Sequence, residues 1–353
     1  MFEKQDTDQR IIRDEYLIAQ VQREIASVVG PGNVNTDATL LHEQSADWSW
    51  ISQYLKYKSL PVPTADLYVS PGTAEEVAEV LRIACEYKIP VVPRGGGSGT
   101  QGGTFAIYGG IAMDLRRLNR VLHIDEISMV VTAEAGIEGP ELEKILNQKG
   151  LTMPHYPGSF HFGATLGGYL AARGSGVVST KYGKAEDLVL QLEAAVPPGK
   201  LVETMKVPSH ASGPGIIQAI VGSEGTLGII TELVVGLAVR PATPATVVAT
   251  FPNIKNAAAA AAVLLRFKPS MLEIIDQTTL KAVEAWHPLG FEVAGSVLLM
   301  QLDEDQERAD EVLTLCKNFE MIDGAASTEA ADAVEFIRVR KLAYPALERL
   351  GAT

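Results

Sequence analysis

The spacing of apolar residues changes about sixty residues into the chain. Residues 9–29 carry apolar side chains at helical spacing, and Gly30-Pro31-Gly32 ends the predicted helix. Residues 33–63 follow no period and are predicted to be irregular. They hold a group of aromatic residues that we interpret as packing: Trp48, Trp50, Tyr54 and Tyr57. We therefore expect an N-terminal helical segment over residues 1–60.

From residue 61 to 240 the pattern alternates short apolar runs with helical stretches. Thr73 and Glu76 form a capping box ahead of a predicted helix that buries Val77, Val80 and Ala84. A shorter helix is predicted around Leu142 and Leu146. The predicted strands are 67–69, 89–92, 111–115, 129–135, 188–196, 201–207 and 229–237.

A linker over residues 240–244 precedes a separate α+β pattern at 245–353. Strands are predicted at 247–251 and 296–302. Helices are predicted at 254–267, 304–316 and 334–350. The sequence thus indicates three parts: 1–60, 61–240 and 245–353.

Glycine concentrates in three zones beside predicted strands, at 93–103, 157–176 and 222–232. A glycine-rich turn lets the backbone approach a ligand and points several N–H groups into one concavity. If the zones converge, they suit a long ligand with a central pyrophosphate. The first zone contains G-x-G-x-x-G at residues 97–102, but no helical pattern follows it, which disfavours a Rossmann site.

Composition excludes several classes of function. A net charge of −13 over 353 residues argues against nucleic acid or an anionic membrane as partner. The only cysteines, Cys85 and Cys316, fit no Fe–S, zinc or disulfide pattern, and we expect no metal at His155 and His161. No apolar run is long enough to span a bilayer, so we expect a cytoplasmic protein.

Five motifs together resemble the vanillyl-alcohol-oxidase (PCMH-type) FAD-binding fold. They are Pro93-Arg-Gly-Gly-Gly-Ser-Gly99, Pro157-Gly-Ser159, Ala164-Thr-Leu-Gly-Gly168, Lys181-Tyr-Gly183 with Asp187, and Gly222-Ser-Glu-Gly-Thr-Leu-Gly228. Within that superfamily the chain is similar to the group of the glycolate oxidase D subunit and D-lactate dehydrogenase, and also to alkyldihydroxyacetonephosphate synthase. The resemblance implies an α+β fold with a two-subdomain FAD-binding domain followed by an incomplete α+β cap.

The resemblance also implies the cofactor and its site. The first loop would wrap the FAD pyrophosphate, the second zone would line the ribityl chain and flavin, and the third would close over the adenine-side half. No histidine lies in the first loop, so we expect FAD to be non-covalent. The implied FAD-binding residues are Pro93, Arg94, Gly95, Gly96, Gly97, Ser98, Gly99, Pro157, Gly158, Ser159, Ala164, Thr165, Gly167, Gly168, Ala172, Arg173, Ser175, Gly176, Tyr182, Glu224, Gly225, Thr226, Gly228, Ile229 and Ile230.

Arg340 lies in the family's arginine motif, where relatives grip a substrate carboxylate, and a guanidinium fork suits that task. The family's later His-Ala-Gly-Asp-Gly-Asn-type segment has no counterpart here, and we find no general base. We therefore expect a cap that is truncated.

The resemblance implies oxidation of a small D-2-hydroxy acid by hydride transfer to FAD. Electrons would pass to an Fe–S or other acceptor subunit, which could place the protein at the inner face of a membrane. Two alternatives stay open: an alkyldihydroxyacetonephosphate-synthase-like flavoenzyme, and an inactive FAD-binding fragment.

Overall fold

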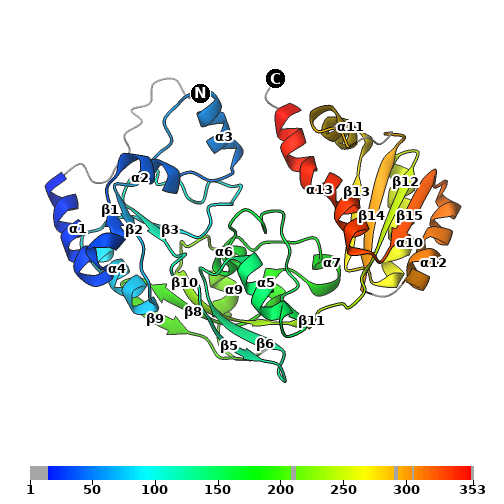
Figure 1. Cartoon of the computed structure of the whole chain (residues 1–353). Helices are drawn as coiled ribbons and strands as arrows, with labels where there is room; N and C mark the ends of the chain where they lie inside the picture. The colour runs from blue at the N-terminus through cyan, green and yellow to red at the C-terminus, as the bar shows by residue number, and fades with distance from the viewer. Residues whose placement is uncertain (1–14, 208–211, 290–292, 304–305, 351–353) are drawn as a thin grey trace. The chain divides into compact units, whose positions relative to one another are not determined.

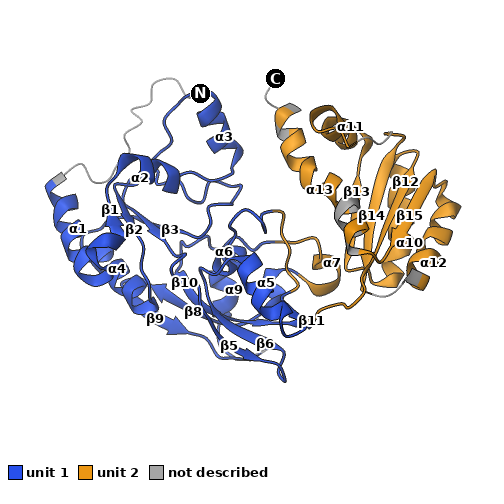
Figure 2. Cartoon of the chain, viewed as in Figure 1, with its two compact units in different colours: residues 1–153, 159–174, 184–238 blue, residues 154–158, 175–183, 239–353 orange. Residues whose placement is uncertain are grey.

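The computed structural model describes residues 15–207, 212–289, 293–303 and 306–350 (Figure 1). The chain forms two compact units, which Figure 2 colours separately. Unit 1 comprises residues 1–153, 159–174 and 184–238, and unit 2 comprises 154–158, 175–183 and 239–353. The start of the helix predicted at residue 9 lies outside the described residues, and the described part begins at Glu15. None of the helices in the described ranges has the length and apolar character needed to cross a bilayer.

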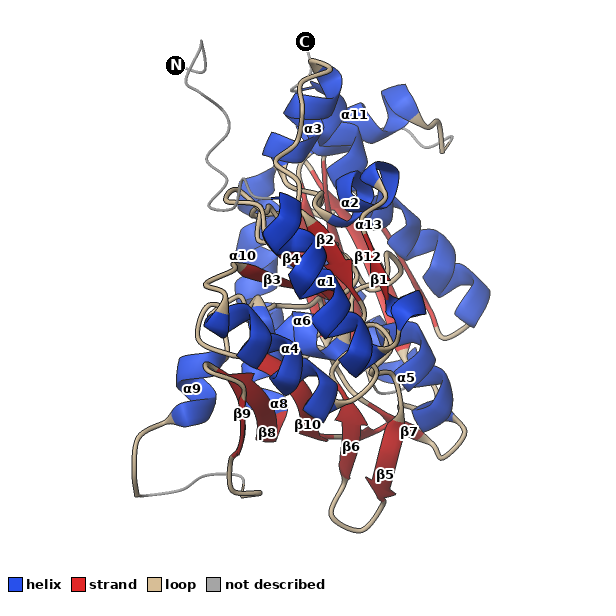
Figure 3. Cartoon of the chain, turned by 90° about the vertical axis from the view of Figure 1, so that its left-hand side faces the viewer, coloured by secondary structure: helices blue, strands red, loops and turns tan. Residues whose placement is uncertain are grey.

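The first half of unit 1 is a four-stranded sheet with helices packed against it. Strand order is β1-β2-β4-β3, with β1 antiparallel to β2 and the other pairs parallel. Helices α1 and α4 pack against each other beside this sheet (Figure 3). The elements are α1 Glu15–Val29, η1 Pro31–Asn33, β1 Val34–Asn35, α2 Ala38–Gln44, α3 Trp50–Tyr57, β2 Leu67–Val69, α4 Ala74–Glu86, β3 Val91–Arg94 and β4 Ile111–Asp114.

Thr73 caps α4 as predicted, but the second bond of the predicted capping box goes to Gly72 instead of Thr73. The Thr73 hydroxyl accepts the Glu76 N–H at 3.2 Å, and the Glu76 carboxylate accepts the Gly72 N–H at 2.6 Å. Val77 and Val80 are fully buried on the predicted face. Local sequence and core packing therefore agree on this helix.

Residues 33–63 were predicted to be irregular. This is wrong, because helices α2 and α3 form there. Asp37 caps α2 by accepting the Leu40 N–H, and Ser49 caps α3 by accepting the Ser52 N–H. The packing interpretation of the aromatic group is also wrong for Trp50 and Tyr57, which are 65% and 67% exposed. Helices of seven and eight residues carry too few turns to show a period.

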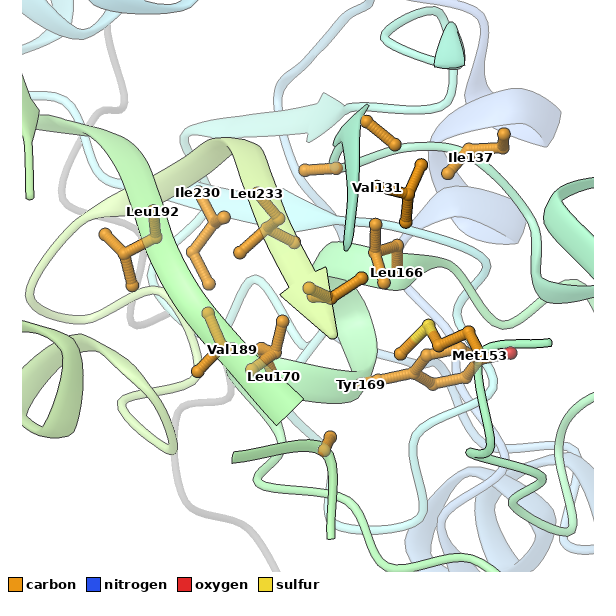
Figure 4. Close-up of a cluster of buried hydrophobic side chains, with 14 of the residues drawn as sticks. Val131, Ile137, Met153, Leu166, Tyr169, Leu170, Val189, Leu192, Ile230 and Leu233 are labelled. Carbon is orange, nitrogen blue, oxygen red and sulfur yellow. The ribbon is translucent and has the colours of Figure 1, made fainter. Parts of the chain in front are cut away.

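The second half of unit 1 is a five-stranded antiparallel sheet in the order β5-β6-β10-β8-β9. Leu166 and Leu170 of α6 pack on it against Leu192 and Leu233 (Figure 4). This packing fixes α6 and thereby the second glycine zone. The elements are β5 Val121–Asp125, β6 Val130–Glu134, α5 Gly139–Asn147, β7 Leu151–Thr152, α6 Leu166–Ala171, α8 Ala185–Leu188, β8 Val189–Val196, β9 Lys200–Glu203, α9 Ile216–Ile220 and β10 Ile229–Gly236.

Unit 2 is built on a four-stranded antiparallel sheet in the order β13-β14-β12-β15. Helices α10 and α12 pack on one face, around Phe251. Ile337 and Val339 of α13 pack on the other face, together with Val177. The elements are α7 Ser179–Tyr182, β12 Ala245–Phe251, α10 Ile254–Leu264, η2 Leu265–Phe267, β13 Met271–Ile275, α11 Gln277–Trp286, β14 Ser296–Leu302, α12 Gln306–Cys316, η3 Lys317–Phe319, β15 Asp323–Ser327 and α13 Ala330–Leu350. Strand β11, Ala238–Val239, contains the last residue of unit 1 and the first of the next unit 2 segment.

Candidate functional site

The first glycine loop leaves β3 and lies directly against the second glycine zone. A Cβ at Gly96 would be 1.7 Å from the carbonyl oxygen of Gly163, and a Cβ at Gly95 would be 2.3 Å from the Thr165 hydroxyl. Real side chains essentially never approach this closely, so glycine fits Gly96 because of a backbone-to-backbone contact and Gly95 because of the Thr165 side chain. The first two zones therefore meet within unit 1.

The third zone closes on the same place. A Cβ at Gly225 would lie 2.2 Å from the Pro93 ring, and Gly225 has φ +82°. The Glu224 N–H donates to the Ala171 carbonyl at 3.0 Å, which joins the third zone to the second. The convergence on which a common ligand site depends is thus present in unit 1.

Helix α6 lies within the second zone and begins after the N-cap residue Thr165. The Thr165 hydroxyl accepts the Gly168 N–H at 3.3 Å, and the Gly167 N–H donates at 2.7 Å to the carbonyl of Ala135, which directly follows β6. Ala164 is buried at the same junction. After α6, Arg173 adopts φ +53° and forms an ion pair with Glu186. That ion pair holds the guanidinium of Arg173 within unit 1.

The remaining unit 1 residues predicted to bind FAD lie partly in a strand and partly in loops or helices. Ile229 and Ile230 are buried and paired with β8, so their side chains belong to the core. The Thr226 hydroxyl donates to the Ser223 carbonyl at 2.7 Å. The other predicted FAD-binding residues of unit 1 lie in loops or at helix ends: Ser98, Gly99, Ser159, Ala172 and Gly228. Their roles toward a cofactor stay predictions.

Five predicted binding residues belong to unit 2: Pro157, Gly158, Ser175, Gly176 and Tyr182. The Gly176 N–H donates to the Ser179 hydroxyl at 2.9 Å. The Tyr182 hydroxyl donates to Asp303, which also pairs with Lys181. Burial, and then this hydrogen bond, raise the pKa of Tyr182. The tyrosine therefore stays neutral and anchors α7 to the sheet of unit 2.

A charged cluster lies behind the first loop. The Arg116 guanidinium and the Tyr68 hydroxyl both donate to the carboxylate of Asp114, which is buried. Arg94 is the register neighbour of Asp114 on the adjacent strand. Burial lowers the pKa of Arg94, and nearby Arg116 lowers it further. The first loop thus rests on a partly buried cation.

Sequence reasoning missed the segment that holds this cation. The Arg94 guanidinium donates to the Ala46 carbonyl at 2.7 Å, and the Trp48 N–H donates to the Gly99 carbonyl at 2.9 Å. The Trp48 ring lies 5.0 Å from the Phe162 ring of the second zone. No local motif marks these residues, because the contacts join positions at least 48 residues apart.

In unit 2, Arg340 of α13 forms an ion pair with Glu273 of β13, with 2.6 Å between Nε and the carboxylate. Both side chains are about one quarter exposed, at 26% and 27%. The contact occupies Nε and leaves the two terminal nitrogens for other acceptors. Over the described ranges, no cluster of histidine, cysteine and acidic side chains could hold a metal.

Two family models cover most of the chain. Residues 65–205 match an FAD binding domain, and residues 240–353 match the C-terminal domain of FAD linked oxidases. The chain belongs to the FAD-linked oxidases. This confirms the expected PCMH-type fold with a following α+β cap, and FAD as cofactor.

The named relatives of this FAD-linked oxidase differ in activity. It is 32% identical to glycolate oxidase subunit GlcD of Bacillus subtilis, over 84% of this chain and 64% of that protein. It is 33% identical to a mitochondrial D-lactate dehydrogenase [cytochrome] of Arabidopsis thaliana, over 79% and 48%. A solved alkyldihydroxyacetonephosphate synthase superposes with TM-score 0.79 at 26% identity, over 93% of this chain and 68% of the other. The matches to the first two span less than two thirds of their length.

The residues around the converging loops fit FAD. Gly96 and Gly225 keep the backbone free of side chains where the loops meet. The hydroxyls of Thr104 and Ser223 are buried beside the first and third zones, with no protein partner among the described residues. Backbone N–H groups and small hydroxyls of this kind hold a diphosphate and ribose without strong basic side chains.

Proposed function

We propose that this FAD-linked oxidase oxidises a small D-2-hydroxy acid, of the glycolate or D-lactate type, to the 2-oxo acid. The names of two relatives, a glycolate oxidase subunit and a D-lactate dehydrogenase, support this substrate class. The reaction removes two electrons and two protons, and bound FAD supplies the hydride acceptor.

The observation that carries the proposal is the state of Arg340. Its guanidinium is partly exposed, and Glu273 holds it at Nε. A guanidinium oriented in this way offers its two terminal nitrogens to a carboxylate as a bidentate fork. We infer that Arg340 binds the substrate carboxylate, and that Glu273 fixes the rotamer in which it does so. We propose no general base.

Further parts of the proposal follow from the site. The first loop contains no histidine, so we propose that FAD is held non-covalently by backbone N–H groups of the three zones. We propose a cytoplasmic protein that passes electrons to an Fe–S or other acceptor subunit, since one relative is itself named as a subunit. The division into 1–60, 61–240 and 245–353 stays a prediction.

Anaerobic titration of the flavin tests the proposal. Glycolate or D-lactate should bleach the flavin absorbance of the purified chain, whereas L-lactate should not. Arg340→Met should keep the bound flavin spectrum and require at least about a hundredfold more acid for half-bleaching. Arg338→Met is the matched control on the same helix, since Arg338 contacts His287 instead, and should bleach as the unaltered chain does. A flavin that no 2-hydroxy acid bleaches contradicts the proposal.

A second candidate is an alkyldihydroxyacetonephosphate-synthase-like flavoenzyme. The structural match at TM-score 0.79 favours it, because that match covers nearly the whole chain. Such an enzyme would bind FAD but would show no bleaching with any simple hydroxy acid. An inactive FAD-binding chain would give the same titration, and it would also lack turnover with acyl-dihydroxyacetone phosphate.

A further inference from the structure

A short segment that precedes the matched FAD-binding domain in sequence, residues 46–48, lies against the first glycine loop of that domain. The match begins at residue 65, whereas Ala46 and Trp48 make the hydrogen bonds to Arg94 and Gly99 described above. Asp47 lies between them and is only 6% exposed. The turn between α2 and α3 therefore forms part of the support of the loop.

The guanidinium of Arg94 lies directly beneath Gly97. A Cβ at Gly97 would be 2.1 Å from Nη2 and 2.2 Å from Cζ of Arg94. The Nε atom is buried and has no hydrogen-bond partner among the described residues. A guanidinium with unused donors in a low-dielectric place is costly unless a nearby anion compensates it. The guanidinium therefore lies against the backbone of the first glycine loop.

Two carboxylates, those of Asp114 and Asp47, act electrostatically on Arg94, and Asp114 acts more strongly. One carboxylate oxygen of Asp47 accepts the Ser49 N–H at 3.0 Å and the Ser52 hydroxyl at 3.1 Å. The other oxygen is buried without a partner among the described residues, and it would lie 4.0 Å from a Cβ at Gly99. Asp114, the other nearby carboxylate, is already engaged by Arg116 and Tyr68.

We propose that two buried charges, those of Arg94 and Asp47, together set the affinity of the first glycine loop for the FAD diphosphate. Arg94 supplies a positive potential through the loop, and Asp47 partly offsets it. Both are positioning residues, which act through the loop backbone. The proposal depends on FAD being the cofactor, and it is independent of the identity of the substrate.

The physical reason lies in the rest of the chain. The protein carries a net charge of −13, and the first loop is not followed by a helix whose N-terminus could face the diphosphate. Loop N–H groups contribute only partial charges. A full charge behind them in a low-dielectric setting adds attraction that surface charges in water cannot provide.

The experiment measures the dissociation constant of the flavin-free chain for FAD and for riboflavin, which lacks the diphosphate. Arg94→Met should weaken FAD binding about tenfold or more and change riboflavin binding less than about twofold. Asp47→Asn keeps the acceptor for Ser49 and Ser52 but loses the charge. It should tighten FAD binding about fivefold, leave riboflavin unchanged, and preserve the unfolding temperature of the flavin-free chain.

Asp37→Asn is the matched control, because Asp37 caps the neighbouring helix α2 at an exposed position and asparagine also caps. It should change neither constant. An Asp47→Asn chain with unchanged or weaker FAD binding overturns the proposal, as does an Arg94→Met chain that loses both flavins equally. If Arg94→Met does not fold, Arg94→Lys decides: it keeps the charge and should retain FAD binding within about threefold, and a larger loss overturns the proposal.

Discussion

The Nε of Arg340 lies 2.6 Å from the carboxylate of Glu273, so a helix and a strand far apart in sequence hold one guanidinium between them. This pairing leaves the guanidinium with a fixed direction but also places a negative charge beside it. The two effects oppose each other for an anionic substrate, and they can be separated by substitution.

Two replacements of Glu273 should change KM for the hydroxy acid in opposite directions. Glu273→Gln keeps an acceptor for Nε and removes the charge, so KM for the hydroxy acid should fall about threefold. Glu273→Leu removes both, so KM should rise about tenfold while kcat changes less than about twofold. Steady-state kinetics of both variants check this. A purely structural role would instead lower kcat and the unfolding temperature in both.

Gly96→Ala should abolish FAD uptake. The added Cβ would be 1.7 Å from the Gly163 carbonyl oxygen, so the first and second zones would be forced apart. We expect a colourless chain with its unfolding temperature lowered by several degrees. Gly32→Ala is the control, since a Cβ there meets nothing within 4 Å. Normal flavin content in Gly96→Ala would mean that contact between the zones is not needed for binding.

Stability should fall as pH falls because of His155. Burial lowers its pKa to about 4, from an ordinary 6.5. The unfolded chain therefore takes up the proton first, and stability present above pH 6.5 is lost progressively down to about pH 4. The full loss is about 3 kcal/mol.

His155→Gln should flatten the stability profile over this pH range, as measured by urea unfolding at a series of pH values. His42→Gln, at an exposed position, should leave the profile as it is. A profile as steep in His155→Gln as in the unaltered chain would assign the loss of stability to other groups.

The sequence predicted the parts of the fold that local chemistry determines. The capping residue Thr73 identified α4, and the glycines of the three zones identified the loops that converge. Strand β15, Asp323–Ser327, was missed because its D-G-A-A-S sequence has no β-branched residue, and it exists through pairing with β12. Strand β13 and helix α11 were missed as well.

The part of the candidate site that is formed by glycine-rich backbone could be predicted from the sequence. The zones 93–103, 157–176 and 222–232 were found because glycine density is visible in one dimension. Asp47 could not be found in this way, because its environment depends on a loop about fifty residues later in the sequence. The role of Glu273 was not predicted either, since its pairing with Arg340 requires the tertiary fold.

The order in which the chain contributes to unit 2 limits how this protein can be divided. Segment 175–183 belongs to unit 2, and its residue Lys181 pairs with Asp303. A polypeptide beginning at Val239 would therefore lack α7 and leave the Asp303 carboxylate without its cation. Excision or domain exchange at the linker would give a unit 2 without α7, so a single cut in the chain cannot release this unit whole.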